Sequence, residues 1–246
     1  MGRARRTANR ARRRAGVGSH GSSGRGPDVR IETERKYLVT HDDAFPDEGA
    51  VTRAFAATPF TVTPKGTIVH KDRYYDDARL SLTRAGFALR RRMGEGRVTA
   101  ALKTLGTVRG GLHVRGELEA EIEADASSWD AWPESIAQHV RTVCDPRSVN
   151  ALMELEVERT LFDVQRDGTT VATLSFDAVA AKRPRSDART TWREVEIEAA
   201  GDTVSDEAND TLAAIGTTVE TLLPLEPTLD TKLQRAQAAW LPGQDA

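Results

Sequence analysis

The sequence predicts a β-dominated α+β fold, in which one antiparallel sheet closes on itself and helices flank it. Two features of the 246-residue chain predict this class. After residue 28, most of the chain alternates between polar and apolar residues in seven or eight segments, a pattern typical of β-strands. Short turns such as Asp167-Gly168 join many of these segments, and a short turn places successive strands antiparallel. A sheet of this kind can remove its open edges by closing into a barrel.

The strands are expected at eight places in the chain. They are residues 29–39, 71–77, 87–93, 97–105, 112–124, 153–165, 169–180 and 191–199. The third and fourth are separated by Gly94-Glu95-Gly96, which favours a tight hairpin. Residues 40–71 are expected to be irregular, apart from a short helix around 49–57.

Three other segments have helical spacing, namely residues 127–143, 204–216 and 228–240. In the first, Ser127 or Ser128 is placed to cap the helix. Its expected apolar face consists of Trp129, Trp132, Ile136, Val140 and Val143. These helices are expected to flank the sheet.

Composition limits the class of protein. A single cysteine, Cys144, excludes an internal disulfide and favours a reducing compartment, so we expect a cytoplasmic protein. No apolar run approaches the roughly 18 residues of a membrane span. The sequence does not indicate an oligomeric state.

The N-terminal segment differs from the rest of the chain. Residues 1–26 contain eight Arg and no Asp or Glu, so we expect residues 1–28 to form a disordered, Arg-rich tail. Such a tail would contact polyanions weakly, and its composition would also suit an organellar transit peptide. Removing its eight positive charges from the formal net charge of −2 leaves −10 for residues 27–246. The expected domain covers residues 29–240, followed by a short tail at 241–246.

Charged residues gather on single faces of the predicted strands. Glu32, Glu34 and Lys36 share one face, because residues two apart on a strand point to the same side. Basic faces recur at Arg90 and Arg92, Lys103 and Arg115, and acidic faces recur at Glu117 and Glu119, Glu154 to Glu158, and Glu194 to Glu198. On any one strand, a solvent-facing polar face explains the pattern. The whole set instead favours inward-facing charges, with one carboxylate wall and one wall of guanidinium and ammonium groups.

Such an interior has a definite ligand chemistry. Clustered carboxylates bind hard divalent cations through oxygen, and Arg and Lys bind phosphate oxygens. The ligand that needs both is a metal-chelated polyphosphate.

The order of motifs resembles the CYTH domain, also called the triphosphate tunnel metalloenzyme family. The expected domain opens with Glu-Thr-Glu-Arg-Lys (32–36), and Gly-Phe-Ala-Leu-Arg-Arg-Arg (86–92) follows Tyr-Tyr-Asp (74–76). Later come Arg-Gly-Glu-Leu-Glu (115–119), Glu-Val-Glu-Ile-Glu (194–198) and a lysine at 232. The resemblance covers roughly residues 29–240. It implies an eight-stranded antiparallel barrel, a triphosphate tunnel, with Mg²⁺ or Mn²⁺ and a small triphosphate inside.

The resemblance also implies roles for individual residues. The implied metal ligands are Glu32, Glu34, Glu117, Glu119, Asp177, Glu196 and Glu198, with Glu194 as an alternative to Glu198. The implied phosphate contacts are Lys36, Arg90, Arg92, Lys103, Arg115, Arg159 and Lys232. A second metal, or Lys36 with Tyr74, would orient and activate water.

Three functions are compatible with this pattern. The first is metal-dependent hydrolysis of inorganic triphosphate or another small triphosphate. The second is an adenylate cyclase of the CYTH type, in which a ribose hydroxyl attacks within the same tunnel. The third is a polyphosphate- or nucleotide-binding module without turnover, for which so many carboxylates would be unnecessary.

Overall fold

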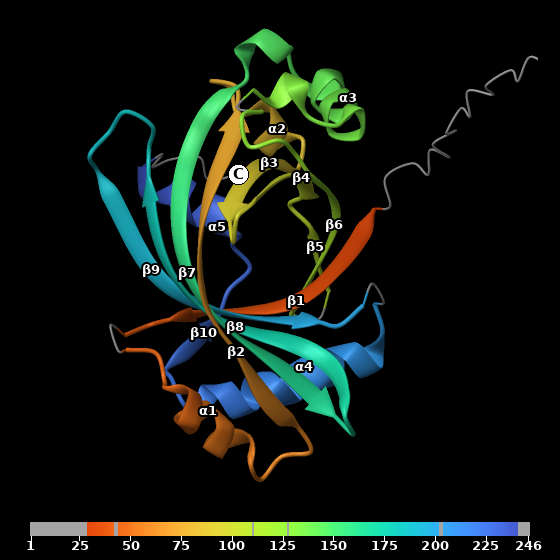
Figure 1. Cartoon of the computed structure of the whole chain (residues 1–246), viewed down its shortest axis with the longest axis vertical. Helices are drawn as coiled ribbons and strands as arrows, with labels where there is room; N and C mark the ends of the chain where they lie inside the picture. The colour runs from red at the N-terminus through yellow and green to blue at the C-terminus, as the bar shows by residue number, and fades with distance from the viewer. Residues whose placement is uncertain (1–28, 42–43, 110, 127, 202–203, 241–246) are drawn as a thin grey trace, which may run out of the picture.

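The computed structural model describes residues 29–41, 44–109, 111–126, 128–201 and 204–240 (Figure 1). The predicted N-terminal and C-terminal tails lie outside the described residues.

Eight antiparallel strands form a closed barrel, as predicted. Around the barrel the order is β1, β9, β8, β7, β2, β3, β4 and β6, and β6 pairs again with β1. The strands are β1 (Arg30–Val39), β2 (Thr61–Asp76), β3 (Phe87–Gly94), β4 (Arg97–Thr104), β6 (Leu112–Glu121), β7 (Asn150–Arg166), β8 (Thr169–Lys182) and β9 (Arg189–Ala199). Two short strands, β5 (Thr107–Arg109) and β10 (Leu225–Pro227), pair with β6 and β1 respectively.

Strand β2 is longer than predicted. It begins at Thr61 rather than at Lys71, and it pairs with β7 along its whole length. The register shifts between Pro64 and Gly66, where Gly66 has a φ of +86°. Because Pro and Gly ordinarily interrupt strands, the sequence predicted an irregular segment here. In the structure they form an irregularity in a strand that continues past it.

The helices lie close to their predicted places. They are α1 (Glu48–Phe55), α2 (Ser81–Arg84), α3 (Glu134–Val143), α4 (Asp206–Glu220) and α5 (Lys232–Trp240), with 3₁₀ turns at Trp129–Ala131 and Pro146–Ser148. The predicted helix 127–143 is divided at Pro133, because proline disfavours a helical conformation in the residue before it. Ser128 makes no capping hydrogen bond, and Ser127 lies outside the described residues. The predicted apolar face of this segment is nonetheless buried or partly buried.

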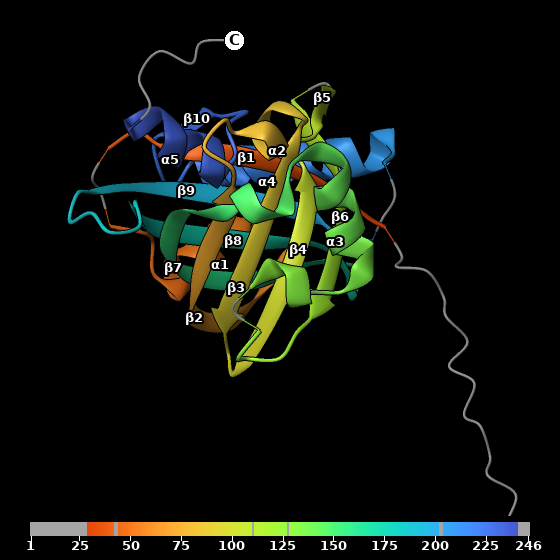
Figure 2. The same ribbon diagram turned by 90° about the horizontal axis from the view of Figure 1, so that it is seen from above.

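Most of the apolar core lies outside the barrel wall. Helices α1 and α4 cover one side, where Phe55 and Ile215 join the outward-facing Tyr37 and Ile197 in one cluster (Figures 1 and 2). Helix α3 covers β3, β4 and β6 in a second cluster. Glycine is required at position 216 of α4, because a Cβ there would lie 2.1 Å from the Tyr37 hydroxyl. Since helices bury the outer face, the inner face is left for the charged residues.

Helix α5 contributes to the interior of the barrel. Its Leu233 belongs to a third cluster with Tyr74 and Leu155, and its first residue, Lys232, is buried. Among the described residues, no helix is long and apolar enough to cross a membrane.

Candidate functional site: a charged tunnel

The inner faces of the strands enclose a polar cavity of about 180 Å³. Strand alternation explains its lining, since Glu32, Glu34 and Lys36 of β1 all point inward while Tyr37 points outward. The charged residues that line it are Arg30, Glu32, Glu34, Lys36, Arg90, Arg92, Lys103, Arg115, Glu117, Glu119, Arg159, Glu196, Glu198 and Lys232, together with Tyr74. Asp177 is fully buried behind this lining, where it pairs with Arg159 and Lys232. The structure therefore brings all the predicted site residues to one tunnel.

One group of contacts joins β1, β4 and β6. Lys103 Nζ lies 2.9 Å from Glu32 Oε1 and 2.9 Å from Glu117 Oε1, and Arg115 Nε donates to Glu32 Oε2 at 2.7 Å. Burial and the neighbouring Glu32 raise the pKa of Glu117 to about 7. Burial also disfavours ionised Glu32, but the hydrogen bond with Glu117 and the charges of Lys103 and Arg115 hold its pKa well below the usual range. This pair is thus poised to hold one proton near neutral pH.

Lys36 lies between two carboxylates. Its side chain is 2% exposed, and its Nζ lies 3.1 Å from Glu196 Oε1 and 3.5 Å from Glu34 Oε1. Glu34 is also 2.9 Å from Arg115 Nη2. Each carboxylate beside Lys36 therefore keeps another basic partner.

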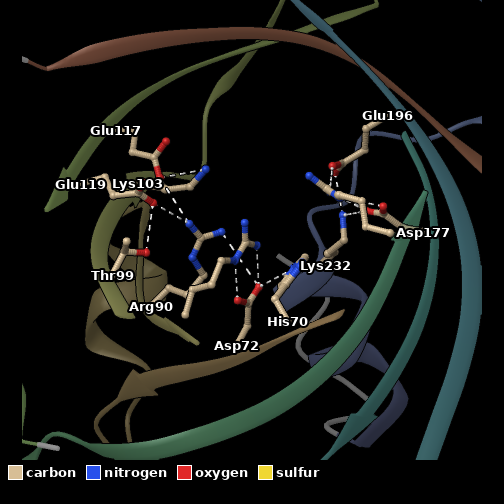
Figure 3. Close-up of polar contacts among 12 residues, drawn as sticks. His70, Asp72, Arg90, Thr99, Lys103, Glu117, Glu119, Asp177, Glu196 and Lys232 are labelled. Carbon is tan, nitrogen blue, oxygen red and sulfur yellow. Dashed lines mark hydrogen bonds and ion pairs between the residues drawn. The ribbon is translucent and has the colours of Figure 1, made fainter. Parts of the chain in front are cut away.

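A buried acidic triad lies across the tunnel from Arg90 and Glu117 (Figure 3). Asp177, Glu194 and Glu196 each offer an oxygen, and these oxygens lie within 4.8 Å of one another, close enough to hold a metal ion. The Nζ of Lys232 lies 2.9 Å from Asp177 and 2.8 Å from Glu196, and it also pairs with Glu194. Burial disfavours its charge, but the three carboxylates raise the pKa of Lys232 well above its usual range. The ammonium group of Lys232 therefore occupies the place that a metal cation would take in this triad.

The carboxylates on the tunnel proper fit a divalent cation better. They supply the hard oxygen donors that Mg²⁺ and Mn²⁺ prefer. Glu34 Oε1 is buried and makes no hydrogen bond within the described residues, but it lies 2.9 Å from Arg115 Nη2, so a metal there would replace that ion pair. Glu119 and Glu198 lie further out, with side chains 44% and 31% exposed.

The expectation of two separate walls is only partly right. Strand β3 carries Arg90 and Arg92 inward and β9 carries Glu196 and Glu198, but β1 and β6 each carry both signs. Acidic and basic groups consequently alternate around the tunnel and neutralise one another.

Two buried polar residues of the site were not assigned to it by the sequence. Asp72 binds Arg92 through two hydrogen bonds, of 2.7 and 2.8 Å, and His70 lies beside it (Figure 3). Both share the inward face of β2 with Tyr74, so alternation from Tyr74 was the available signal. Glu194, considered only as an alternative to Glu198, pairs with Lys232, whereas Glu198 pairs with Arg30 near the surface.

Tyr74 remains a neutral phenol. Burial, reinforced by the charge of Asp72, raises the pKa of Tyr74 above its usual value. It can therefore donate a hydrogen bond into the tunnel but is not suited to removing a proton at neutral pH.

Comparison with known families agrees with this geometry. The CYTH domain matches residues 30–231, which is most of the chain. The chain belongs to the CYTH family. No curated protein matches the sequence.

Solved structures of low sequence identity share the fold of this CYTH protein. A proposed adenylyl cyclase from Hippeastrum, described as having a dominant triphosphatase activity, has a TM-score of 0.58 at 19% identity and covers 85% of this chain and 96% of its own. A proposed adenylate cyclase from Bacillus halodurans has a TM-score of 0.56 at 19% identity, covering 84% and 97%. A Pyrococcus horikoshii protein has a TM-score of 0.53 at 16% identity, covering 85% and 99%.

Proposed function

We propose that this CYTH protein hydrolyses the terminal phosphoanhydride of a small linear triphosphate, with inorganic triphosphate as the foremost candidate, using Mg²⁺ or Mn²⁺. The observation that carries the proposal is the alternation of buried carboxylates and buried cations inside one closed barrel. A ligand that brings several negative charges together with divalent cations can replace these ion pairs without leaving either sign unpaired. A simple anion or a simple cation would leave charges of one sign without partners.

The basic side chains would bind the phosphate oxygens. They project from separate strands, with Arg90 and Arg92 on β3, Lys103 on β4, and Arg115 on β6. Arginine suits this task because its planar guanidinium can donate two parallel hydrogen bonds. The carboxylates that these groups now contact would hold the metal, chiefly Glu32, Glu34 and Glu196. Glu117, Glu119, Asp177 and Glu198 would complete or support that set.

When bound, Mg²⁺ or Mn²⁺ supplies a Lewis acid that polarises the phosphate oxygens. The chain would then contribute positioning and electrostatic stabilisation, which can perform most of the catalysis in phosphoryl transfer. Lys36 would donate to the attacking water or to a phosphate oxygen that gains charge, since its ammonium lies at the meeting point of Glu34 and Glu196. Tyr74, as a neutral phenol, would donate a hydrogen bond beside it.

The size of the tunnel favours a small substrate. At about 180 Å³ it is smaller than the roughly 300 Å³ that begins the usual range for pockets of drug-sized ligands. A linear triphosphate needs only the charged groups already described. A nucleotide would also need a surface for its base, and most of the residues lining this cavity are charged.

The direct test is incubation of purified protein with tripolyphosphate, ATP or thiamine triphosphate, with Mg²⁺ or Mn²⁺. We expect orthophosphate release from tripolyphosphate that a chelator abolishes. Cyclic AMP and pyrophosphate from ATP would instead establish a cyclase. Tight tripolyphosphate binding without turnover would establish a binding module. We propose the cytoplasm as its location, on the ground of the single cysteine.

A further inference from the structure

A second cavity, of about 250 Å³, adjoins the tunnel. Arg92, Glu119 and Arg159 line both cavities, so these side chains form part of the boundary between them. The second cavity has its own polar lining in His70 and Arg97. Neither of these residues belongs to the set expected to bind triphosphate.

The imidazole of His70 has no partner for either nitrogen. The residue is 3% exposed, and neither Nδ1 nor Nε2 makes a hydrogen bond with any residue in the described part of the chain. The nearest charged group is Asp72, whose Oδ2 lies 3.8 Å from Nε2, beyond hydrogen-bonding range. Arg92 already occupies both oxygens of that carboxylate. Leaving a buried donor and acceptor unsatisfied is unfavourable, and such groups call for an explanation.

His70 is neutral in this environment. Burial and the positive charge of Arg92 lower the pKa of His70 to about 3. A neutral imidazole carries one N–H donor and one acceptor nitrogen. Three guanidinium groups, Arg92, Arg97 and Arg159, line the cavity against two carboxylates, Glu95 and Glu119. This excess of positive charge favours an anion, for which the N–H donor of His70 is the suitable group.

The backbone makes room for this side chain. Gly94 on β3 pairs with His70 on β2, and a Cβ at position 94 would lie 2.8 Å from the His70 Cβ. Any other residue at 94 would force His70 or the adjoining backbone to shift. The hairpin that follows, through Glu95 and Gly96, brings Arg97 to the same cavity.

We propose that this second cavity is an oxyanion subsite, in which the His70 N–H and the Arg97 guanidinium bind a phosphate group beyond the triphosphate positions. The inference extends the proposed function. The phosphate can come from two sources, the next unit of a chain longer than three phosphates or released orthophosphate. Both present the same oxygens, and the experiment separates them.

The test follows the His70 imidazole by NMR in full-length, ¹⁵N-labelled protein. Mg²⁺ is present, because the proposed function binds polyphosphate together with metal, and all variants are made in the Lys36→Met background, in which turnover is expected to be slow. Orthophosphate, tripolyphosphate and tetrapolyphosphate are titrated separately, and His70→Gln identifies the His70 resonances. Arg97→Gln tests the cavity, because Arg97 lines it and is exposed, so we expect its replacement to leave the fold intact. Arg147→Gln, an exposed arginine on a distant 3₁₀ turn, is the matched control.

We expect the His70 resonances to shift with tetrapolyphosphate but not with tripolyphosphate if the source is a longer chain. A shift with orthophosphate identifies the released product. In either case Arg97→Gln should weaken the response about tenfold, the loss expected for one charge-assisted hydrogen bond, while Arg147→Gln retains it.

Unmoved His70 resonances with both orthophosphate and tetrapolyphosphate would overturn the inference. A shift of the His70 resonances that is equally large in Arg97→Gln would also overturn the inference. The readout does not depend on turnover. A His70 response in a protein that hydrolyses no triphosphate would therefore reject the proposed function and keep the subsite.

Discussion

The ammonium of Lys232 lies 2.9 Å from the carboxylate of Asp177, and this contact joins the first residue of α5 to the middle of β8. Glu194 and Glu196 contact the same ammonium. The position of helix α5 therefore depends on the charges of the carboxylates that contact Lys232.

Lys232→Met should destabilise the metal-free protein. Removing one member of a buried ion pair leaves the others uncompensated, which costs about 3–5 kcal/mol. Divalent cations should recover part of the loss by binding the vacated triad, so the metal-induced rise in Tm should exceed that of the wild type. Thermal melts with and without Mg²⁺ measure both effects.

The matched control is Lys182→Met. Lys182 is half-exposed and pairs with Glu154 on the surface, so its loss should change stability by less than about 1 kcal/mol. If Lys232→Met melted like the wild type and gained no more from Mg²⁺, the triad would not depend on the lysine.

Lys36→Met and Lys103→Met should affect different kinetic constants. Neither substitution leaves a carboxylate alone. Glu34 and Glu32 both keep Arg115, Glu196 keeps Arg159, and Glu117 keeps Arg90. If Lys36 acts mainly on the transition state, its loss should lower kcat about 100-fold with little change in KM. Loss of Lys103 should mainly raise KM, about tenfold. Steady-state kinetics with tripolyphosphate separate these cases, and equal effects on KM alone would remove the special role of Lys36.

The metal-free protein should lose stability as pH rises through about 7. The folded pKa of Glu117, about 7, exceeds its ordinary value of 4.5, so folding favours the protonated carboxyl. This contribution is fully present below about pH 4.5 and is lost as pH rises through the folded pKa. Metal binding must displace that proton, so metal affinity should increase over the same range.

Glu117→Gln should flatten this pH dependence, because an amide does not titrate. The measurement is Tm between pH 5 and 8, comparing the two proteins in chelator and in Mg²⁺. The histidines His70 and His113 have lowered pKa values and change stability in the opposite sense, but they are common to both proteins. Parallel curves for wild type and variant would show that Glu117 does not hold the proton.

Removing residues 1–26 should leave kcat with tripolyphosphate nearly unchanged, because the described residues that line the tunnel lie between Arg30 and Leu233. The tail carries eight Arg and no acidic residue, so its loss should weaken low-salt binding to long polyanions. Activity and polyanion binding at low and high salt measure the two effects. A large fall in kcat would mean that the tail takes part in the tunnel.

Local periodicity was sufficient to predict which residues share a strand face, but not in every case which face is the inner one. The acidic face Glu154 to Glu158 of β7 was expected inside, yet it lies on the outer face, where Glu154 and Glu156 pair with the exposed Arg73 and Lys71. On β1, the alternation of Glu32, Glu34 and Lys36 with Thr33 and Arg35 assigned one face to the tunnel, because the side-chain direction of a strand depends only on its own two-residue repeat. The same reasoning failed for β2. Pro64 and Gly66 indicated an interruption, but pairing with β7 continues on both sides of them. A bulge depends on the neighbouring strand as much as on its own residues.

The partnerships inside the tunnel were decided only by the tertiary structure. The sequence placed Lys232 among phosphate contacts, but its position in the triad requires α5 to pack beside β8 and β9. The sequence predicted Glu32 and Glu117 as two alike metal ligands, whereas barrel closure brings them together beside Lys103 and drives their pKa values apart. The Coulomb energy of two charges depends on their separation and on their burial. Glu32 and Glu117 are 85 positions apart in the chain, so they become buried neighbours only when the barrel closes.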